Sequence, residues 1–216
     1  MASLVFSILT FGRQNGFSQG FVNLDFEHPI LPLNPVNSQV SIGNGLPGWT
    51  GYGGTIQLNP ADKIWYNTIS LGAAAISLQG PGSLQPILQG NYTVGLQGSS
   101  AAAPTSAAIG QTGQVPLGSQ SLQFFGSELG NFQVTFNGQL LPYIGIGSGA
   151  NYTLYGADIS AFAGQTGQLL FTALPNGGAL LDNIQFSPNP VPEPGAWTLL
   201  LCGAVLFRVG RWKRKA

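Results

Sequence analysis

The stretch at residues 131–143, NFQVTFNGQLLPY, decides the fold class of this chain. Apolar residues at every second position from 132 to 136 alternate with polar ones, which is the period of a strand with one buried face. Asn137 and Gly138 then supply the residues that a type I′ turn prefers, because both central positions of that turn need a positive φ. We therefore predict a β-hairpin, with its turn at Asn137-Gly138 and its second strand at residues 139–143.

Similar short segments occur on both sides of this hairpin. FVNLDFE, residues 21–27, alternates in the same way and is predicted to be a half-buried strand. Gly, Pro or Asn separates most of the segments, and no convincing amphipathic helix is present, so the predicted fold is all-β, an antiparallel β-sandwich or jelly roll. A low-complexity loop is predicted at residues 99–106. Further strands are predicted at residues 69–78, 92–96, 121–125, 152–159, 168–174 and 180–186.

The composition agrees with this fold class. The 216 residues include 32 glycines and 15 prolines, and 44% of the chain is hydrophobic, which is enough for one domain with a sizeable core. Only 6% of the residues are charged, against about 25% in an ordinary soluble protein. Five of the seven Lys and Arg residues lie in the last nine positions, so the rest of the chain is mildly acidic. We therefore predict no nucleic-acid partner, because the body has no basic surface.

The last 26 residues, VPEPGAWTLLLCGAVLFRVGRWKRKA, combine three features in a fixed order. Pro192, Glu193 and Pro194 come first, the apolar run at residues 196–207 follows, and the basic cluster ends the chain. This arrangement resembles the PEP-CTERM sorting signal of Gram-negative bacteria. The resemblance implies export, recognition of the Pro-Glu-Pro motif by an exosortase-type membrane enzyme, and a location in the cell envelope or the extracellular matrix. It also implies a C-terminal transmembrane helix in the lipid bilayer, although the apolar run is shorter than the roughly 20 residues such a helix normally needs.

These features predict four segments. Residues 1–19 are interpreted as a weak or truncated signal peptide, with a first strand of the fold as the alternative. Residues 20–187 form the β-sandwich domain, and residues 188–195 form a linker that carries the Pro-Glu-Pro motif. Residues 196–216 form the single transmembrane helix and a basic tail, which the positive-inside rule places in the cytoplasm.

Three acidic residues are candidates for a metal site. Strand parity places Asp182 on the same face as Ile184 and Phe186, so its side chain either points inward or lies at a bulge. A buried carboxylate needs a partner. The body has only two Lys or Arg residues to serve it. A calcium ion held by Asp25, Glu27 and Asp182 with backbone carbonyls would meet that need. The alternative is that Asp182 and Asn183 cap a turn through local hydrogen bonds.

The same acidic residues lie in two stretches with a family resemblance. The first predicted strand contains an N-x-x-F-E pattern at residues 23–27, and the last contains LDNI at residues 181–184. The two stretches are similar to the first and last strands of carbohydrate-binding jelly rolls. The resemblance implies that the two strands lie close together and that a structural calcium ion binds beside them.

Aromatic residues in and after the glycine-rich stretch at residues 46–54 are candidates for glycan binding. Flat rings stack on sugar faces, and we assign this role to Tyr52, Trp65 and Tyr66. The alternative for these residues is core packing, which is the role predicted for Trp49.

No catalytic group is evident. His28 is the only histidine, no G-x-S-x-G motif is present, and no spacing of acidic residues favours the paired carboxylates of a glycosidase. We therefore predict a non-enzymatic protein associated with the envelope or matrix. The alternatives are a carbohydrate-binding module for an exopolysaccharide and, third, a surface glycoside hydrolase.

Overall fold

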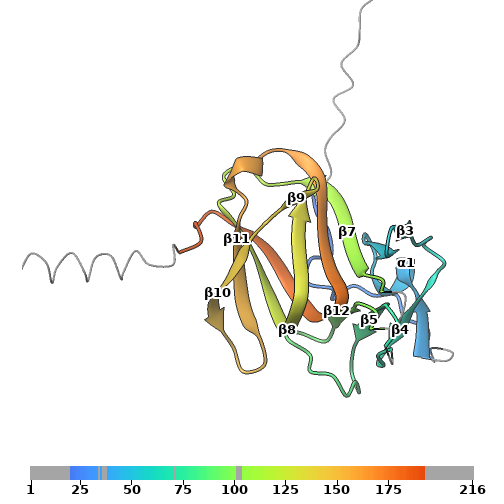
Figure 1. Ribbon diagram of the computed structural model, residues 1–216. Helices are drawn as coiled ribbons and strands as arrows, with labels where there is room; N and C mark the ends of the chain where they lie inside the picture. The colour runs from blue at the N-terminus through green and yellow to red at the C-terminus, as the bar shows by residue number, and fades with distance from the viewer. Residues whose placement is uncertain (1–19, 34, 36–37, 71, 101–103, 193–216) are drawn as a thin grey trace, which may run out of the picture.

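The computed structural model describes residues 20–33, 35, 38–70, 72–100 and 104–192 (Figure 1). These residues form strands joined by turns, one short helix, α1 (Ile42–Gly45), and one 3-10 turn, η2 (Ser160–Phe162). The prediction of an all-β domain is confirmed. None of the helices in the described part of the chain has the length and apolar character of a membrane span. The predicted signal peptide and transmembrane helix lie outside these residues.

The strands differ greatly in length. Ten are short or of ordinary length, and two, β8 and β12, are unusually long. The strands are β1 (Gln39–Ser41), β2 (Thr50–Gly53), β3 (Ile56–Gln57), β4 (Lys63–Tyr66), β5 (Ala75–Gln79), β6 (Thr93–Gln97), β7 (Ala107–Gln114), β8 (Ser121–Phe136), β9 (Gln139–Leu140), β10 (Tyr143–Ser148), β11 (Thr153–Asp158) and β12 (Thr166–Ser187).

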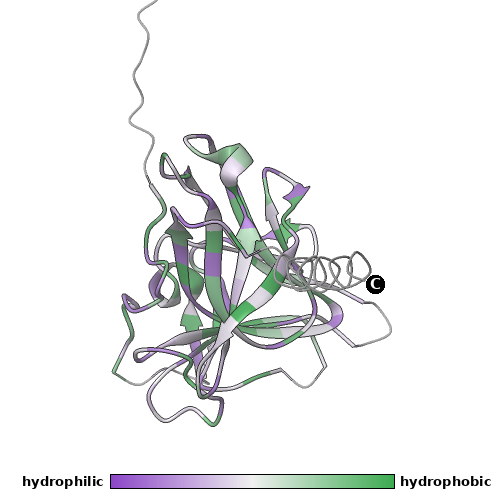
Figure 2. Cartoon of the chain, turned by 90° about the vertical axis from the view of Figure 1, so that its left-hand side faces the viewer, coloured by the Kyte–Doolittle hydropathy of each residue, from purple (hydrophilic) through white to green (hydrophobic). Residues whose placement is uncertain are grey.

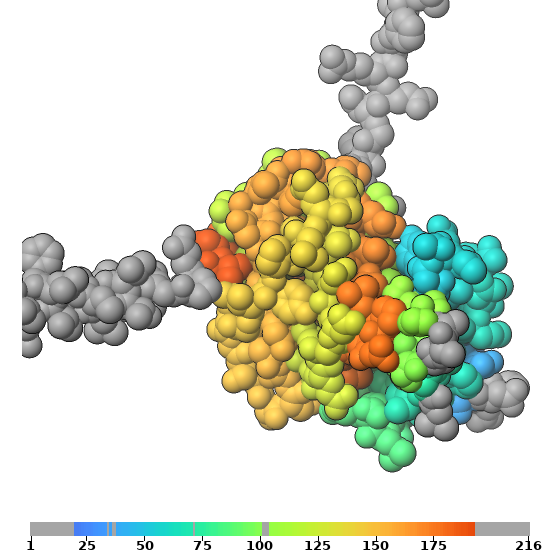
Figure 3. Space-filling model, viewed as in Figure 1, coloured from blue at the N-terminus to red at the C-terminus, as the bar shows by residue number. Residues whose placement is uncertain are grey.

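The two long strands connect two layers. The first half of β12, residues 166–173, pairs with β7 on one side. In the second half, residues 178–187, the first four residues pair with β6 on the same side. On its other side β12 pairs antiparallel with β8, and the register shifts between the two halves. Bulges of this kind bend a strand and let it pass from one sheet to the other. In Figure 3 the orange surface of β12 lies between the yellow surface of β8 and the lime-green surface that includes β7.

Each layer contains one half of each long strand. The β6 layer runs β1, β4, β5, β6, second half of β12, first half of β8, β11 and β10. The β7 layer runs β3, β2, β7, first half of β12, second half of β8 and β9. All pairs are antiparallel except β4 with β5. This arrangement is the predicted β-sandwich.

The core lies between the two layers. Phe124 in the β6 layer meets Phe171 in the β7 layer, with ring centroids 5.5 Å apart and planes at 76°. Edge-on pairs of this kind contribute about 0.5–1.5 kcal/mol beyond the burial of apolar area. Trp49 is also in this core: it is 5% exposed, and its indole N–H donates to the carbonyl of Asn23. Figure 2 shows apolar and polar residues alternating along several strands, as expected when each strand has one buried face.

The predicted hairpin is confirmed at its turn. Phe136 faces Gln139, and Asn137 and Gly138 have φ angles of 49° and 76°, as a type I′ turn requires. The second strand is shorter than predicted, because β9 ends at Leu140 and the chain pairs again only as β10.

Several other boundaries differ from the prediction. Residues 21–27 do not form a strand: their φ angles turn positive at Asn23 and Phe26. The side chain of Gln111 replaces a neighbouring strand here, since it both accepts from the N–H and donates to the carbonyl of Val22. The predicted strands at 168–174 and 180–186 are parts of the single strand β12, and only the end of 69–78 is extended, as β5.

Candidate functional site

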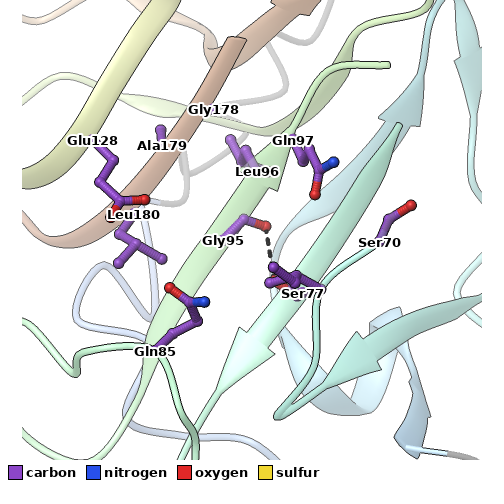
Figure 4. A pocket seen from close by; sticks show the side chains of 11 residues that line it. Ser70, Ser77, Gln85, Gly95, Leu96, Gln97, Glu128, Gly178, Ala179 and Leu180 are labelled. Atoms are coloured by element: carbon purple, nitrogen blue, oxygen red, sulfur yellow. Dashed lines mark hydrogen bonds between the residues drawn. The ribbon is translucent and has the colours of Figure 1, made fainter. Parts of the chain in front are cut away.

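A groove opens on the outer face of the β6 layer, over β5, β6 and the second half of β12. Its cavity volume is about 320 Å³. Figure 4 shows its lining, with Ser70 on one side and Glu128 on the side of β12. The side chains that supply its polar atoms are Ser70, Ser77, Gln85, Gln97 and Glu128, and Ile69 and Leu180 supply apolar surface.

The floor of this groove contains Ser77, Gly95 and Leu180, which belong to a row of residues in direct register across four strands. Trp65 begins this row and lies beside the lining. Trp65 in β4 pairs with Ser77, Ser77 with Gly95, and Gly95 with Leu180. Residues that pair directly point to the same face of a sheet. Ile64, the neighbour of Trp65 in β4, is 2% exposed in the core, so the partly exposed Trp65 ring lies on the groove face. The row therefore places an aromatic ring beside a small polar floor.

Gly95 keeps the floor of the groove low. A Cβ atom at this position would collide with the hydroxyl of Ser77, which donates to the carbonyl of Gly95 at 3.3 Å (Figure 4). Any larger residue would fill the space between Ser77 and Leu180. Glycine at this position thus leaves a depression in the middle of the sheet.

A buried hydrogen-bond network holds the loops at the groove. Gln79 is fully buried, and its amide donates to the hydroxyl of Ser77 at 2.9 Å and to the carbonyl of Thr68 at 3.1 Å. Its carbonyl accepts from the hydroxyl of Ser83 at 2.6 Å. The two loops fixed in this way are those that bring Ser70 and Gln85 to the groove. Fully satisfied networks of this kind make a site rigid.

The predicted glycan-binding residues are not brought together. Trp65 flanks the groove, whereas Tyr66 points to the opposite face, where it pairs with the fully buried Leu78. Burial raises the pKa of Tyr66, and the neighbouring Tyr92 raises it further. Tyr52 lies on β2 in the other layer, and its hydroxyl accepts from the amide of Gln168 at 2.8 Å.

Asp182, one of the predicted metal ligands, is fully buried. Its carboxylate accepts from the N–H of Gln89 at 3.0 Å, the hydroxyl of Thr93 at 2.8 Å and the N–H of Asn183 at 2.7 Å. Burial raises the pKa of Asp182 to about 7, and the carboxylate of Glu27 adds to that rise, although the three donors oppose it. The bond from Asn183, whose φ is 43°, matches the predicted local cap.

Glu27 lies close enough to raise the pKa of Asp182, and like Asp182 it accepts hydrogen bonds from the loop at residues 89–92. Its carboxylate accepts from the N–H groups of Asn91 and Tyr92, at 2.8 and 2.9 Å, and from the side-chain amide of Asn91 at 3.1 Å. The segment at residues 21–27, called the first segment below, also contacts β12 directly, because the N–H of Ile184 donates to the carbonyl of Leu24.

The fit of calcium to these residues is partial. Asp25 accepts only from the nearby N–H of Glu27, at 3.3 Å, and among the described residues no three acidic, His or Cys side chains form a group that could hold a metal ion. Glu27 and Asp182 remain as two neighbouring carboxylates of which one is fully buried. Calcium at this position therefore stays a prediction.

The other predicted sites fall largely outside the groove. Pro192, the first residue of the Pro-Glu-Pro motif, is exposed at the end of the described chain, and Glu193 and Pro194 lie outside the described residues. The contacts of His28 indicate no function for its imidazole ring. The hydrogen bond that the structure gives for this residue runs from its backbone N–H to the side-chain oxygen of Asn23. Glu128 is the one acidic residue in the groove lining, so the lining does not contain the paired carboxylates of a glycosidase.

The groove itself was missed by sequence reasoning. Small residues such as Ser77 and Gly95 carry no motif, and they meet Trp65 and Leu180 only through the register of four strands. The one available signal was Trp65, a large aromatic residue next to an apolar one in a short strand.

No protein-family model and no curated protein matches the chain. Among solved structures, a cyclase from Fischerella sp. TAU in complex with 4-(1H-indol-3-yl)butan-2-one has a TM-score of 0.46 and 15% identity, covering 82% of this chain and 99% of that chain. The enzymatically active domain of tailspike protein 4 of bacteriophage CBA120 has a TM-score of 0.39 and 14% identity, covering 68% and 21%. A family 11 carbohydrate-binding module from Clostridium thermocellum, in complex with a β-1,3-1,4-mixed-linked tetrasaccharide, has a TM-score of 0.36 and 12% identity, covering 72% and 97%.

These comparisons correct one prediction. The similar structures include enzymes, a cyclase and a tailspike domain, so the prediction that this protein is non-enzymatic is wrong as an exclusion and is withdrawn. At TM-scores below 0.5 the similarities transfer neither an activity nor a ligand to this chain. The groove must therefore be interpreted from its own chemistry.

Proposed function

We propose that the groove of the β6 layer binds a glycan, and that the protein serves in the cell envelope or extracellular matrix by holding an exopolysaccharide. The observation that carries this proposal is the row of Ser77, Gly95 and Leu180 in the groove, with Trp65 next in the row beside the lining. The row combines a flat ring at one end, an apolar side chain at the other and a low polar floor between them.

This combination suits the surface of a sugar chain. A pyranose ring has apolar C–H faces and a rim of hydroxyl groups. The apolar faces pack on aromatic and aliphatic side chains such as Trp65 and Leu180. The hydroxyl groups need partners that both donate and accept, and Gln85 and Gln97 at the groove supply amides that do both. Ligand sites generally combine apolar walls with a few placed polar groups in this way.

The proposal is tested by affinity gel electrophoresis of the full chain on a panel of polysaccharides. Trp65→Ala is expected to weaken binding about fivefold, because the loss of a stacking ring costs of the order of 1 kcal/mol. Tyr52→Ala is the matched control, since it removes an aromatic ring from the other layer. Retention of every polysaccharide at wild-type affinity by Trp65→Ala, or the absence of any binding by the wild type, would contradict the proposal.

The proposed location rests on the tail. The Pro-Glu-Pro motif, the apolar run and the basic cluster support export and handling by an exosortase-type enzyme. A residue that precedes proline favours an extended conformation, which a protease-like site can bind. Mass spectrometry of the protein from its native host tests this part: a new C-terminus near Pro194 is expected. A cytosolic protein that ends at Ala216 would contradict it.

A further inference from the structure

Glu128 is the single charged residue of the groove, and it lies in a bulge of β8. Ser127 pairs with Leu180, and Gly130 pairs with Gly178, so Glu128 and Leu129 face one residue of β12. The extra residue turns the side chain of Glu128 toward the groove rim, where it is exposed (Figure 4). Bulges frequently redirect a side chain beside a binding site.

The backbone at Glu128 is strained. Its φ is 57°, in the left-handed region that glycine occupies without cost and glutamate does not. Three nearby positions, Gly126, Gly130 and Gly178, are glycines, yet the strained position itself carries a charged side chain. Residues in this conformation cluster at functional sites, and Glu128 is the charged residue among the described non-glycine residues that adopt it.

The carboxylate of Glu128 is also free. Among the described residues, Glu128 is the acidic residue for which the structure gives no hydrogen bond or ion pair. The other acidic side chains all accept hydrogen bonds that hold loops or turns, and these are Asp25, Glu27, Asp62, Asp158 and Asp182. The free carboxylate at the groove is therefore available to a ligand.

No cation lies in the groove lining given by the described residues. Lys63 is the one Lys or Arg among these residues; it lies two positions before Trp65 on the same face of β4 and, like Trp65, is outside the lining. An acidic sugar would face the carboxylate of Glu128 with no basic side chain in the lining. Unpaired like charges in a binding site select against a ligand, whereas a carboxylate that accepts two hydroxyl groups makes strong hydrogen bonds.

We infer that Glu128 is the specificity-determining residue of the groove, and that it selects a glycan without acidic groups by accepting hydrogen bonds from neighbouring hydroxyl groups of the sugar. This inference rests on the proposed glycan-binding function and adds the chemical class of the ligand. It excludes uronate, sulfated and phosphorylated polysaccharides as preferred ligands.

The test uses affinity gel electrophoresis of the full chain on uncharged polysaccharides, namely dextran, arabinoxylan, galactomannan and hydroxyethyl cellulose, beside alginate and polygalacturonate. The wild type is expected to bind an uncharged polysaccharide and neither acidic one. Glu128→Gln keeps the shape of the side chain and removes its charge, so it is expected to weaken that binding about tenfold, the difference between a charged and a neutral hydrogen bond. Asp158→Asn is the matched control, because it removes one exposed negative charge away from the groove.

Each outcome decides between the two claims. Equal weakening by Glu128→Gln and Asp158→Asn, or no weakening by either, overturns the role of Glu128 and leaves glycan binding standing. Preferential binding of alginate or polygalacturonate by the wild type also overturns the inference alone. Binding of none of the six polysaccharides by the wild type overturns the proposed function and this inference with it. A melting temperature of Glu128→Gln equal to that of the wild type confirms that the variant is folded.

Discussion

Glu27 and Asp182, from opposite ends of the domain, hold one loop between them. Asp182 accepts from the N–H of Gln89 and the hydroxyl of Thr93, and Glu27 accepts from the N–H groups of Asn91 and Tyr92. The loop fixed in this way leads from Gln85 at the groove into β6. The two carboxylates therefore join the first segment, the last strand and the border of the groove.

Removal of the buried carboxylate is expected to destabilise the fold strongly. Asp182→Ala leaves the N–H groups of Gln89 and Asn183 and the hydroxyl of Thr93 without their acceptor, at a cost of about 3 kcal/mol. Asp158→Ala, which removes an exposed carboxylate, is the control and is expected to cost less than about 1 kcal/mol. Urea unfolding measures both. Equal losses in the two variants would contradict the structural role of Asp182.

The stability of the domain is expected to depend on pH through Asp182. Its pKa is raised to about 7 in the folded state from an ordinary value of 3.8, so the folded state binds more protons between those values. The contribution is therefore fully present below pH 3.8 and is lost as the pH rises toward 7. Hydrogen bonds from Ser160 lower the pKa of Asp158. The contribution of Asp158 to stability therefore depends on pH with the opposite sign, but it changes only below its ordinary pKa of 3.8, outside this range.

The measurement is urea unfolding at intervals from pH 4.5 to 7.5 in the presence of EDTA. The free energy of unfolding of the wild type is expected to fall across this range, and Asp182→Asn is expected to flatten the fall. A wild-type stability that rises with pH, or a variant with the same slope, would show that Asp182 does not titrate in this range.

Calcium is expected to stabilise the domain if it binds beside Glu27 and Asp182. A ligand at about 100 times its Kd stabilises the state that binds it by about 2.7 kcal/mol. Thermal unfolding with calcium should therefore occur at a higher temperature than in EDTA, and Glu27→Gln should remove the difference. Magnesium, which requires a stricter octahedral geometry, is the control. Identical melting temperatures in calcium and EDTA would rule out the predicted site.

The hairpin turn provides a test of backbone conformation. Gly138 has a φ of 76° and Gly53 does not have a positive φ, yet a Cβ atom would meet nothing within 4 Å at either position. Gly138→Ala is therefore expected to cost about 1–2 kcal/mol through strain alone. Gly53→Ala is expected to be neutral or to stabilise by up to about 1 kcal/mol. Equal effects on the free energy of unfolding would contradict the type I′ turn.

Local patterns explain what the sequence predicts well. The hairpin at Asn137-Gly138, the strands that became β6 and β11, and the burial of Trp49 all follow from periodicity, turn residues or side-chain size. Each of these features is decided within a few residues of the chain. The close approach of residues 21–27 to β12, through the hydrogen bond from the N–H of Ile184 to the carbonyl of Leu24, agrees with the expectation drawn from the resemblance.

Long-range contacts explain what the sequence does not predict. The strand β7 contains small residues and glycines, so it has no clear period, and it forms because β12 and β2 lie on its two sides. The segment at 21–27 alternates as a strand does, but the side chain of Gln111 satisfies its backbone instead. The groove depends on the register that joins Trp65 to Ser77, and a one-residue slip in that register would remove it.

The most direct test of the central claim is a titration of the isotope-labelled protein with the polysaccharide that it binds most tightly, followed by NMR. The account predicts that the indole N–H signal of Trp65 and the amide signals of Ser77, Gly95 and Gln97 shift together with a single affinity. Shifts confined to β2 and β3 around Tyr52, with Trp65 and Gly95 unchanged, would contradict it.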